Sequence, residues 1–199
     1  MHKTVAMHRF NQMTDTQLVS AFQKGNLDAL ETLVERHKDK LYTTIYFLVK
    51  DKYLAEDLFQ EVFIKVIDTL QKKQYNDEGK FLPWLLRIAH NLCIDYFRKV
   101  QRKPTIINSD NQDVFEWLGG EAPSKEQQMI QQEWYHQVEH LLQRLPAEQR
   151  EVIVLRHYGD MSFKEIAQVT NCSINTALGR MRYGLINLRK MMDEHKIAV

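Results

Sequence analysis

The chain has 199 residues, of which 44% are hydrophobic and 27% are charged, and its formal net charge is +1. This length accommodates one domain or two small ones, and the balanced charge does not by itself indicate a nucleic acid or any other charged partner. The two cysteines and eight histidines stand in no metal-ligand spacing, so we expect neither a metal nor a cofactor, and no apolar run is long enough to cross a membrane.

The N-terminal part predicts three helices. Glycine and proline are scarce, at seven and four, and strand-like alternation is absent, so the fold class should be all-α. Residues Met1–Gln12 lack the apolar core of a signal peptide, which favours a reduced, cytoplasmic protein. A capping box at Thr14-Asp15-Thr16-Gln17 begins a helix that ends near Gly25, and a longer helix follows from about Asp28 to Val49. The third, from about Tyr53 to Leu70, has one broad apolar face and a polar face opposite it.

A basic helix with interspersed aromatic residues is expected next, from Phe81 to about Arg102, after a polar, turn-rich segment at Gln71–Lys80. Cations neutralise phosphates, and exposed rings stack on unpaired bases at roughly 1–3 kcal/mol each. This combination favours a nucleic-acid-binding surface. The alternative for Trp84 is that it belongs to the apolar face of a core helix, and the sequence leaves both interpretations open.

The composition changes after Lys103. Residues 104–133 contain six acidic residues against one basic residue, with Gly119-Gly120 and little helical periodicity before about Glu126. We interpret residues 101–125 as an acidic linker between two small helical domains, residues 14–100 and residues 126–195.

The second domain predicts a helix-turn-helix. Helices are expected at about Glu126–Arg144 and Ala147–His157, and Ser162-Phe163-Lys164-Glu165 is a second capping box. Ser173 is a further N-cap, and the helix behind it has basic residues but no acidic one as far as Lys190. This arrangement places a second helix in the major groove of DNA.

The face of this last helix that reads DNA follows from its apolar stripe. The residues expected in the core are Ile174, Leu178, Met181, Leu185 and Leu188. Thr176, Gly179, Tyr183 and Asn187 lie opposite on a helical wheel, with Arg180 alongside. Glycine within a helix costs about 1 kcal/mol relative to alanine, so Gly179 suggests close approach of the backbone to DNA, with neutral drift as the alternative.

Three motifs in order resemble the sigma-70 family of bacterial RNA polymerase sigma factors, in its short extracytoplasmic-function (ECF) form. The motifs are Asp57-Leu58-Phe59-Gln60-Glu61-Val62-Phe63, the run from Phe81 through Trp84-Leu85, Ile88-Ala89, Asn91 and Asp95 to Arg98-Lys99, and Leu145-Pro146 with Arg150 and Val152 ahead of the helix-turn-helix. The resemblance covers the chain from about Thr14 to Met192. One departure is that Leu178 and Gly179 stand where the family pattern has a basic residue and a serine.

The resemblance implies a role for each set of residues. Asp57, Gln60 and Glu61 would bind core RNA polymerase. Without the resemblance, these three residues would be interpreted as a solvated helix face. Gln74–Pro83 would capture a flipped base of the promoter −10 element. The residues that would contact the melted −10 strand are Lys80, Phe81, Trp84, Arg87, Asn91, Arg98 and Lys99. The residues that would contact the −35 element are Ser173, Asn175, Thr176, Gly179, Arg180 and Tyr183.

The expected function is therefore that of a non-enzymatic subunit with core RNA polymerase and promoter DNA as partners. An anti-sigma factor is a further candidate partner on which the sequence is silent. The acidic linker would thread toward the basic polymerase channels or serve as a disordered spacer. Its 25 residues reach about 85 Å, against about 70 Å for two duplex turns. The alternative is a conventional helix-turn-helix regulator with an N-terminal sensing domain. An enzyme is the weakest class, because no nucleophile motif or Gly-rich phosphate loop is present.

Overall fold

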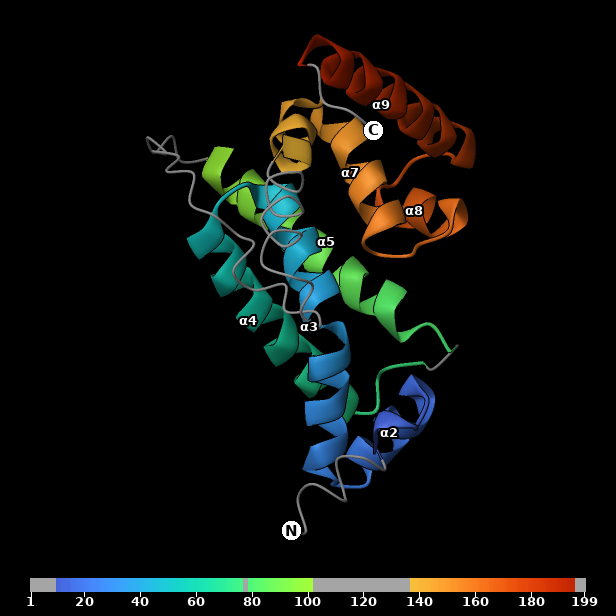
Figure 1. The fold of residues 1–199 in the computed structure, drawn as a ribbon. Coiled ribbons are helices and arrows are strands. Elements are labelled where there is room, and N and C mark those ends of the chain that lie inside the picture. Colours follow the sequence, from blue (N-terminus) through green and yellow to red (C-terminus); the bar gives the residue numbers. More distant parts are fainter. Residues whose placement is uncertain (1–9, 77–78, 102–136, 196–199) are drawn as a thin grey trace, which may run out of the picture.

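The computed structural model describes residues 10–76, 79–101 and 137–195, and every regular element within these ranges is helical (Figure 1). The helices are α2 (Asp15–Gln23), α3 (Leu27–Val49), α4 (Lys52–Gln71), α5 (Phe81–Gln101), α7 (Ala147–His157), α8 (Phe163–Val169) and α9 (Ile174–Glu194). Residues 137–144 are also helical. The all-α prediction is confirmed. The linker predicted at residues 101–125 lies outside the described residues beyond Gln101.

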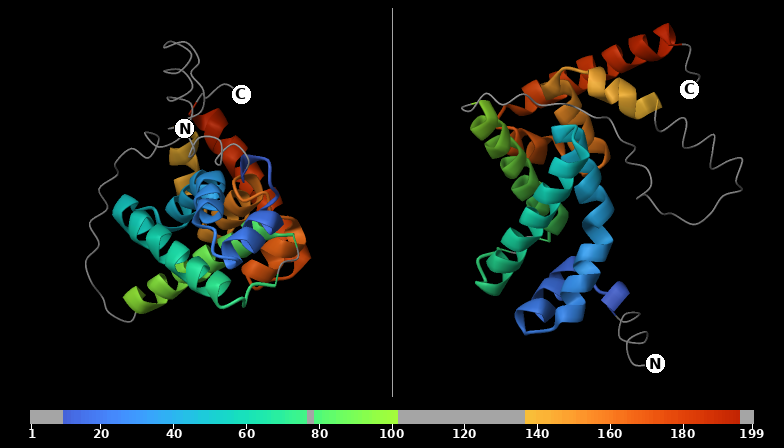
Figure 2. Two further views of the ribbon diagram at one scale, coloured as in Figure 1. Left: turned by 90° about the horizontal axis from the view of Figure 1, so that it is seen from below. Right: turned by 90° about the vertical axis from the view of Figure 1, so that its left-hand side faces the viewer.

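The first domain is built on a long hairpin of α3 and α4, against which α5 and α2 pack (Figures 1 and 2). Side-chain caps define its helix starts: Thr14 and Gln17 form the predicted capping box, and Asn26 and Asp51 cap α3 and α4. Lys50 turns the chain between the hairpin helices in the left-handed conformation, with φ of 59°. The predicted apolar face of α4 is buried or partly buried against the other helices.

The second domain places α8 and α9 in a helix-turn-helix held by α7 (Figure 1). The Ser162–Glu165 capping box is present, and the Ser173 hydroxyl caps α9 by accepting from the Thr176 amide at 3.0 Å. Helices α7 and α9 approach closely at Gly184, where an added Cβ would lie 2.8 Å from Ile153 Cδ1 and 3.3 Å from Gln149 Cβ. This glycine therefore sets the spacing of the two helices.

The predicted core face of α9 is partly wrong. Ala177 and Gly184 are its buried residues, and the partly buried Met181, Leu188 and Met191 continue their row. Ile174, Leu178 and Leu185 are exposed instead. Asn187, expected to face outward, is half-buried and donates to Gln149 Oε1 at 2.8 Å. Small residues allow α7 to sit closer to one side of α9, which rotates the helix away from its most hydrophobic stripe.

The two domains pack against each other through the ends of their helices. Arg150 of α7 is buried, and its Nε donates to the Phe47 carbonyl at the end of α3 at 3.0 Å. Lys50 donates in return to the Gln143 carbonyl, at the end of the helix at 137–144, and the rings of Phe47 and Tyr158 stack at 5.2 Å. Each domain thus supplies a cation to the negative carbonyl end of a helix in the other. One continuous apolar core joins them.

Candidate nucleic-acid and polymerase interfaces

Five of the seven residues predicted to contact the melted strand lie along one side of α5, four of them within the helix and Lys80 directly before its first residue. The five are Lys80, Trp84, Arg87, Asn91 and Arg98, and each lines one of two hollows between the domains. Their spacings of four, three, four and seven residues keep them on one side of a helix. Lys99 is exposed but lines neither hollow.

Phe81 does not belong to this surface. Only 2% of it is exposed, and its ring packs on those of His37, Tyr75 and Trp84 at 5.4–6.0 Å between centroids. We therefore correct its predicted role in strand contact to a core role: burial of its ring fixes the start of α5. Trp84 is half-buried. Its ring packs at a tilt against that of Tyr75, with the centroids 4.4 Å apart, and it also lines a hollow, so each of the two interpretations describes part of its surroundings.

The smaller hollow, of about 350 Å³, separates the start of α5 from α8. Across it Lys80 Nζ lies 2.8 Å from Glu165 Oε1. Burial raises the pKa of Glu165, but hydrogen bonds from Lys80 and Ser162 outweigh it and lower that pKa to about 2. Lys80, a predicted phosphate contact, is therefore paired with a carboxylate of the helix-turn-helix.

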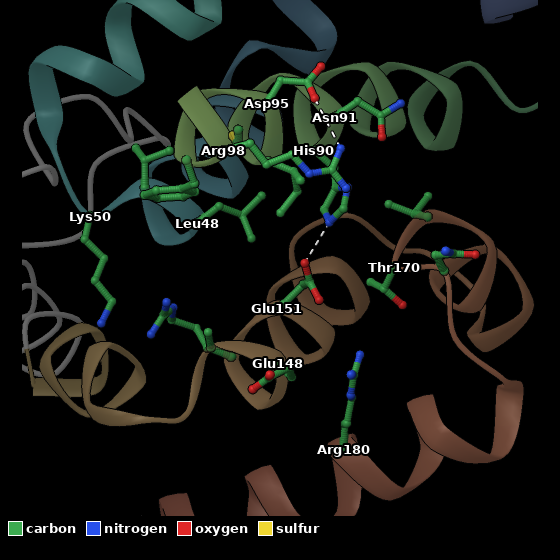
Figure 3. A pocket seen from close by; sticks show the side chains of 18 residues that line it. Leu48, Lys50, His90, Asn91, Asp95, Arg98, Glu148, Glu151, Thr170 and Arg180 are labelled. Atoms are coloured by element: carbon green, nitrogen blue, oxygen red, sulfur yellow. Dashed lines mark hydrogen bonds and ion pairs between the residues drawn. The ribbon is translucent and has the colours of Figure 1, made fainter. Parts of the chain in front are cut away.

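The larger cavity, of about 810 Å³, separates the end of α5 from α7 and α9 (Figure 3). His90 and Glu151 meet at its wall, with Nε2 and Oε1 2.7 Å apart. Asn91 and Arg98 line it from α5, and Arg180 points into it from α9 (Figure 3). The face of α5 that is predicted to contact the melted strand is thus covered by the second domain over both hollows.

The other predicted −35 residues lie at the outer side of the helix-turn-helix. Ser173, Asn175, Thr176 and Tyr183 are exposed, and Gly179 is half-exposed with open space where a Cβ would stand. Arg180 does not share this surface, because it is partly buried at the cavity between the domains. Arg180 lies one turn from both Thr176 and Tyr183 on α9, at the edge where their side of the helix meets the cavity between the domains.

The predicted polymerase-binding residues share the exposed face of α4. Asp57, Gln60 and Glu61 are all exposed, and Glu61 lies 3.8 Å from Lys65 in a pair within the helix. Ile64, 67% exposed, lies one turn beyond them. A single exposed apolar side chain is common on solvated helix faces, so the polymerase-binding role of this face rests on the family resemblance.

The described residues hold no group of three or more histidine, cysteine or acidic side chains arranged for a metal ion. In the same part of the chain, no helix combines the length and the apolar character needed to span a membrane. Cys93 lines the larger cavity, but burial raises the pKa of its thiol to about 12, which makes it a poor nucleophile.

Comparison with known proteins identifies both domains. Sigma-70 region 2 matches residues 33–103, and Sigma-70, region 4 matches residues 135–178. The RNA polymerase sigma-H factor of Pseudomonas aeruginosa is 30% identical over 174 residues, which cover 85% of this chain and 89% of that protein. The ECF RNA polymerase sigma factor SigW of Bacillus subtilis is 28% identical over 189 residues, or 92% and 99% of the two chains.

Solved structures share the fold. CnrH in complex with the cytosolic domain of CnrY matches 92% of this chain and 99% of its own, with a TM-score of 0.62 and 22% identity. The sigma factor RpoE of Bartonella quintana, in complex with the anti-sigma factor NepR, matches 82% of this chain and 96% of its own, with a TM-score of 0.64 and 19% identity.

Fold and sequence together define an RNA polymerase sigma factor. Within that class, the chain belongs to the ECF group of the sigma-70 family. Sigma factors direct core RNA polymerase to promoters, so its partners are core polymerase and promoter DNA. The N-terminal domain is itself a sigma-70 region, which decides against a conventional regulator with a sensing domain there.

Sequence reasoning gave no role at these surfaces to four residues that shape them. Tyr75 anchors the polar segment before α5 by burying its ring against Trp84. Arg150 joins the domains, and Leu178 and Arg182 are exposed beside the predicted −35 residues. A row of small residues seven apart, Ala177 and Gly184, is the signal that could have shown which side of α9 packs.

Proposed function

We propose that α4 carries the contact with core polymerase, that α5 guides the melted −10 strand, and that the start of α9 reads the −35 element. In this proposal residues 14–100 and 126–195 act as two separate DNA-binding domains. The observation that carries it is the single face of α5 on which Lys80, Trp84, Arg87 and two further polar residues are aligned. Cations and a ring along one line fit an unpaired strand.

The two DNA contacts require the domains to separate. The α5 face is covered by α7, α8 and α9, so a strand cannot lie there while the second domain is packed against it. The −10 and −35 elements are about 70 Å apart if two duplex turns separate them. We propose that binding to core polymerase exchanges the contacts between the domains for contacts with polymerase.

The chain itself has no catalytic role in this proposal, and it acts in the cytoplasm, where promoter DNA and polymerase are. An anti-sigma factor is a further candidate partner, supported by the RpoE structure, which is a complex with one.

The test of the polymerase contact is charge reversal at Asp57 and Glu61. Both are exposed, so the double change to Lys should leave helical content and melting temperature nearly unchanged. It should nevertheless abolish co-purification with core polymerase and run-off transcription from genomic fragments. A matched control reverses Glu31 and Asp193, two exposed carboxylates on other helices, and should transcribe normally. Normal binding of core by the Asp57/Glu61 variant would show that α4 is misassigned.

A further inference from the structure

We propose that Leu178 reads a thymine in the −35 element through the 5-methyl group of the base. This inference rests on the proposed function of α9 and adds to it a residue and a base chemistry. The starting observation is that Leu178, although it belongs to the most hydrophobic stripe of the helix, is 43% exposed. The neighbouring Ala177 is fully buried and marks the side of α9 that packs against the rest of the domain, so Leu178 lies outside that packed side.

The position of Leu178 along α9 favours contact with bases. It is the fifth residue of the helix, and N-terminal residues of a recognition helix contact base edges. Gly179 follows it, and an added Cβ there would meet no protein atom within 4 Å. No side chain therefore projects from α9 at the residue after Leu178, which allows the helix backbone to come close to the floor of a groove.

The charge around Leu178 identifies its partner as DNA rather than another protein. From Ser173 to Met192 the chain has no acidic residue and four basic ones. Arg182 is exposed one turn beyond Leu178 on the same side, and Arg189 two turns further on. An apolar side chain flanked by cations, with no carboxylate among them, complements a thymine flanked by phosphates.

The chemistry of leucine selects the base. Leucine neither donates nor accepts a hydrogen bond, and the thymine methyl is the apolar group on the base edges of the major groove. Contact with it removes apolar surface from water on both sides. Leu178 should therefore distinguish thymine from uracil, which differs from it by that methyl alone.

Leu185 provides a matched control on the same helix. It is a leucine, it is 49% exposed, and it follows Leu178 by seven residues, so it lies on the same side of α9. Its Cα is about 10 Å further along the helix axis, beyond the part that enters the groove. A general effect of removing exposed apolar surface would act on both leucines, whereas base reading should involve Leu178 alone.

The experiment uses holoenzyme reconstituted from the full chain and core polymerase. A −35 sequence is first selected from a randomised library, and each thymine in it is then replaced singly by deoxyuridine. Wild type should lose affinity at one of these thymines by about fourfold, the factor that burial of one methyl group supplies. Leu178→Ala should bind thymine DNA more weakly and lose nothing further with deoxyuridine, whereas Leu185→Ala should keep the wild-type ratio.

Each failure has a distinct meaning. If the library yields no −35 preference, the proposed function of α9 is wrong, and this inference with it. If a preference is selected but wild type binds thymine and deoxyuridine equally, or Leu178→Ala keeps the wild-type ratio, the −35 role stands and Leu178 is not the reader. Unchanged circular dichroism of both alanine variants excludes loss of folding as the cause.

Discussion

Glu165 connects local structure to the arrangement of the domains. Its carboxylate accepts from the Ser162 amide at 2.8 Å and completes the capping box that starts α8. The same group pairs with Lys80 of the first domain. Its negative charge stands where a strand phosphate would stand if Lys80 contacts DNA as proposed.

Glu165→Gln tests the contribution of that charge to stability. The pKa of Glu165 is about 2 in the folded chain, against an ordinary 4.5, so folding favours the ionised form. Its stabilisation is complete above about pH 4.5 and should be lost as the pH falls toward 2. Glutamine keeps the capping box but carries no charge. The difference in free energy of unfolding between wild type and variant, measured by urea denaturation, should therefore shrink across this pH range. Parallel curves would contradict the role of the charge.

At the scale of the element, α9 shows how much of the molecule could be predicted. The bounds of α2, α3, α4, α5 and α7 and both capping boxes follow from caps and periodicity, because those signals are local in sequence. The rotation of α9 about its axis does not, because Gly184 and its contact with Ile153 decide it, and that contact is tertiary. The flanking position of Arg180 was predicted, but the cavity that it lines was not, because the packing of the two domains is also tertiary.

Two glycines of α9 should respond oppositely to the same change. Gly179 has open space around its missing Cβ, so Gly179→Ala should stabilise the chain by up to about 1 kcal/mol through helix propensity. Gly184→Ala gains the same propensity, but its Cβ would lie 2.8 Å from Ile153 Cδ1 and 3.3 Å from Gln149 Cβ, which cannot move without the α7 backbone, so overpacking of about 1–3 kcal/mol should exceed that gain. Its melting temperature should fall while that of Gly179→Ala rises, as measured by calorimetry. Equal shifts would show that α7 and α9 are not in close contact.

The Gly179→Ala variant also tests the approach of α9 to DNA. If the backbone comes close to the groove floor, the more stable protein should bind the −35 element less tightly within holoenzyme. Unchanged affinity would favour neutral drift at this position.

At the scale of the whole molecule, two ion pairs join the domains at their surface, Lys40 with Asp160 and Lys80 with Glu165. The hydrogen bond from Lys40 lowers the pKa of Asp160, an exposed carboxylate. Deeper contacts run from Arg150 and Lys50 to helix ends. Such carbonyl ends accept from water equally well once exposed, so separation need not unfold either domain.

Replacing Asp160 by Asn and Glu165 by Gln should loosen this packing. The Lys40–Asp160 pair is exposed and contributes about 0.2–1 kcal/mol, and its loss together with that of the pair at the partly buried Glu165 should shift the equilibrium between packed and separated domains by several-fold. The radius of gyration by small-angle X-ray scattering should be larger than that of wild type at low salt, and the difference should shrink at high salt. The control Glu194→Gln removes a surface pair with Lys190 within α9 and should leave the radius unchanged. If the double variant does not expand, the domains are held together by Arg150 and the apolar core rather than by these two ion pairs.

The covered face of α5 also sets how strongly the free chain can hold DNA. A binding surface that is available in a fraction of molecules has its apparent affinity reduced by that fraction, so 1% open molecules bind about a hundredfold more weakly than the open domain alone. Raising the open fraction from 1% to 99% requires about 5.5 kcal/mol of preferential binding to the open form. If core polymerase supplies that preference, as the proposed exchange of contacts requires, the packed arrangement would keep unattached sigma factor from occupying promoters before polymerase arrives.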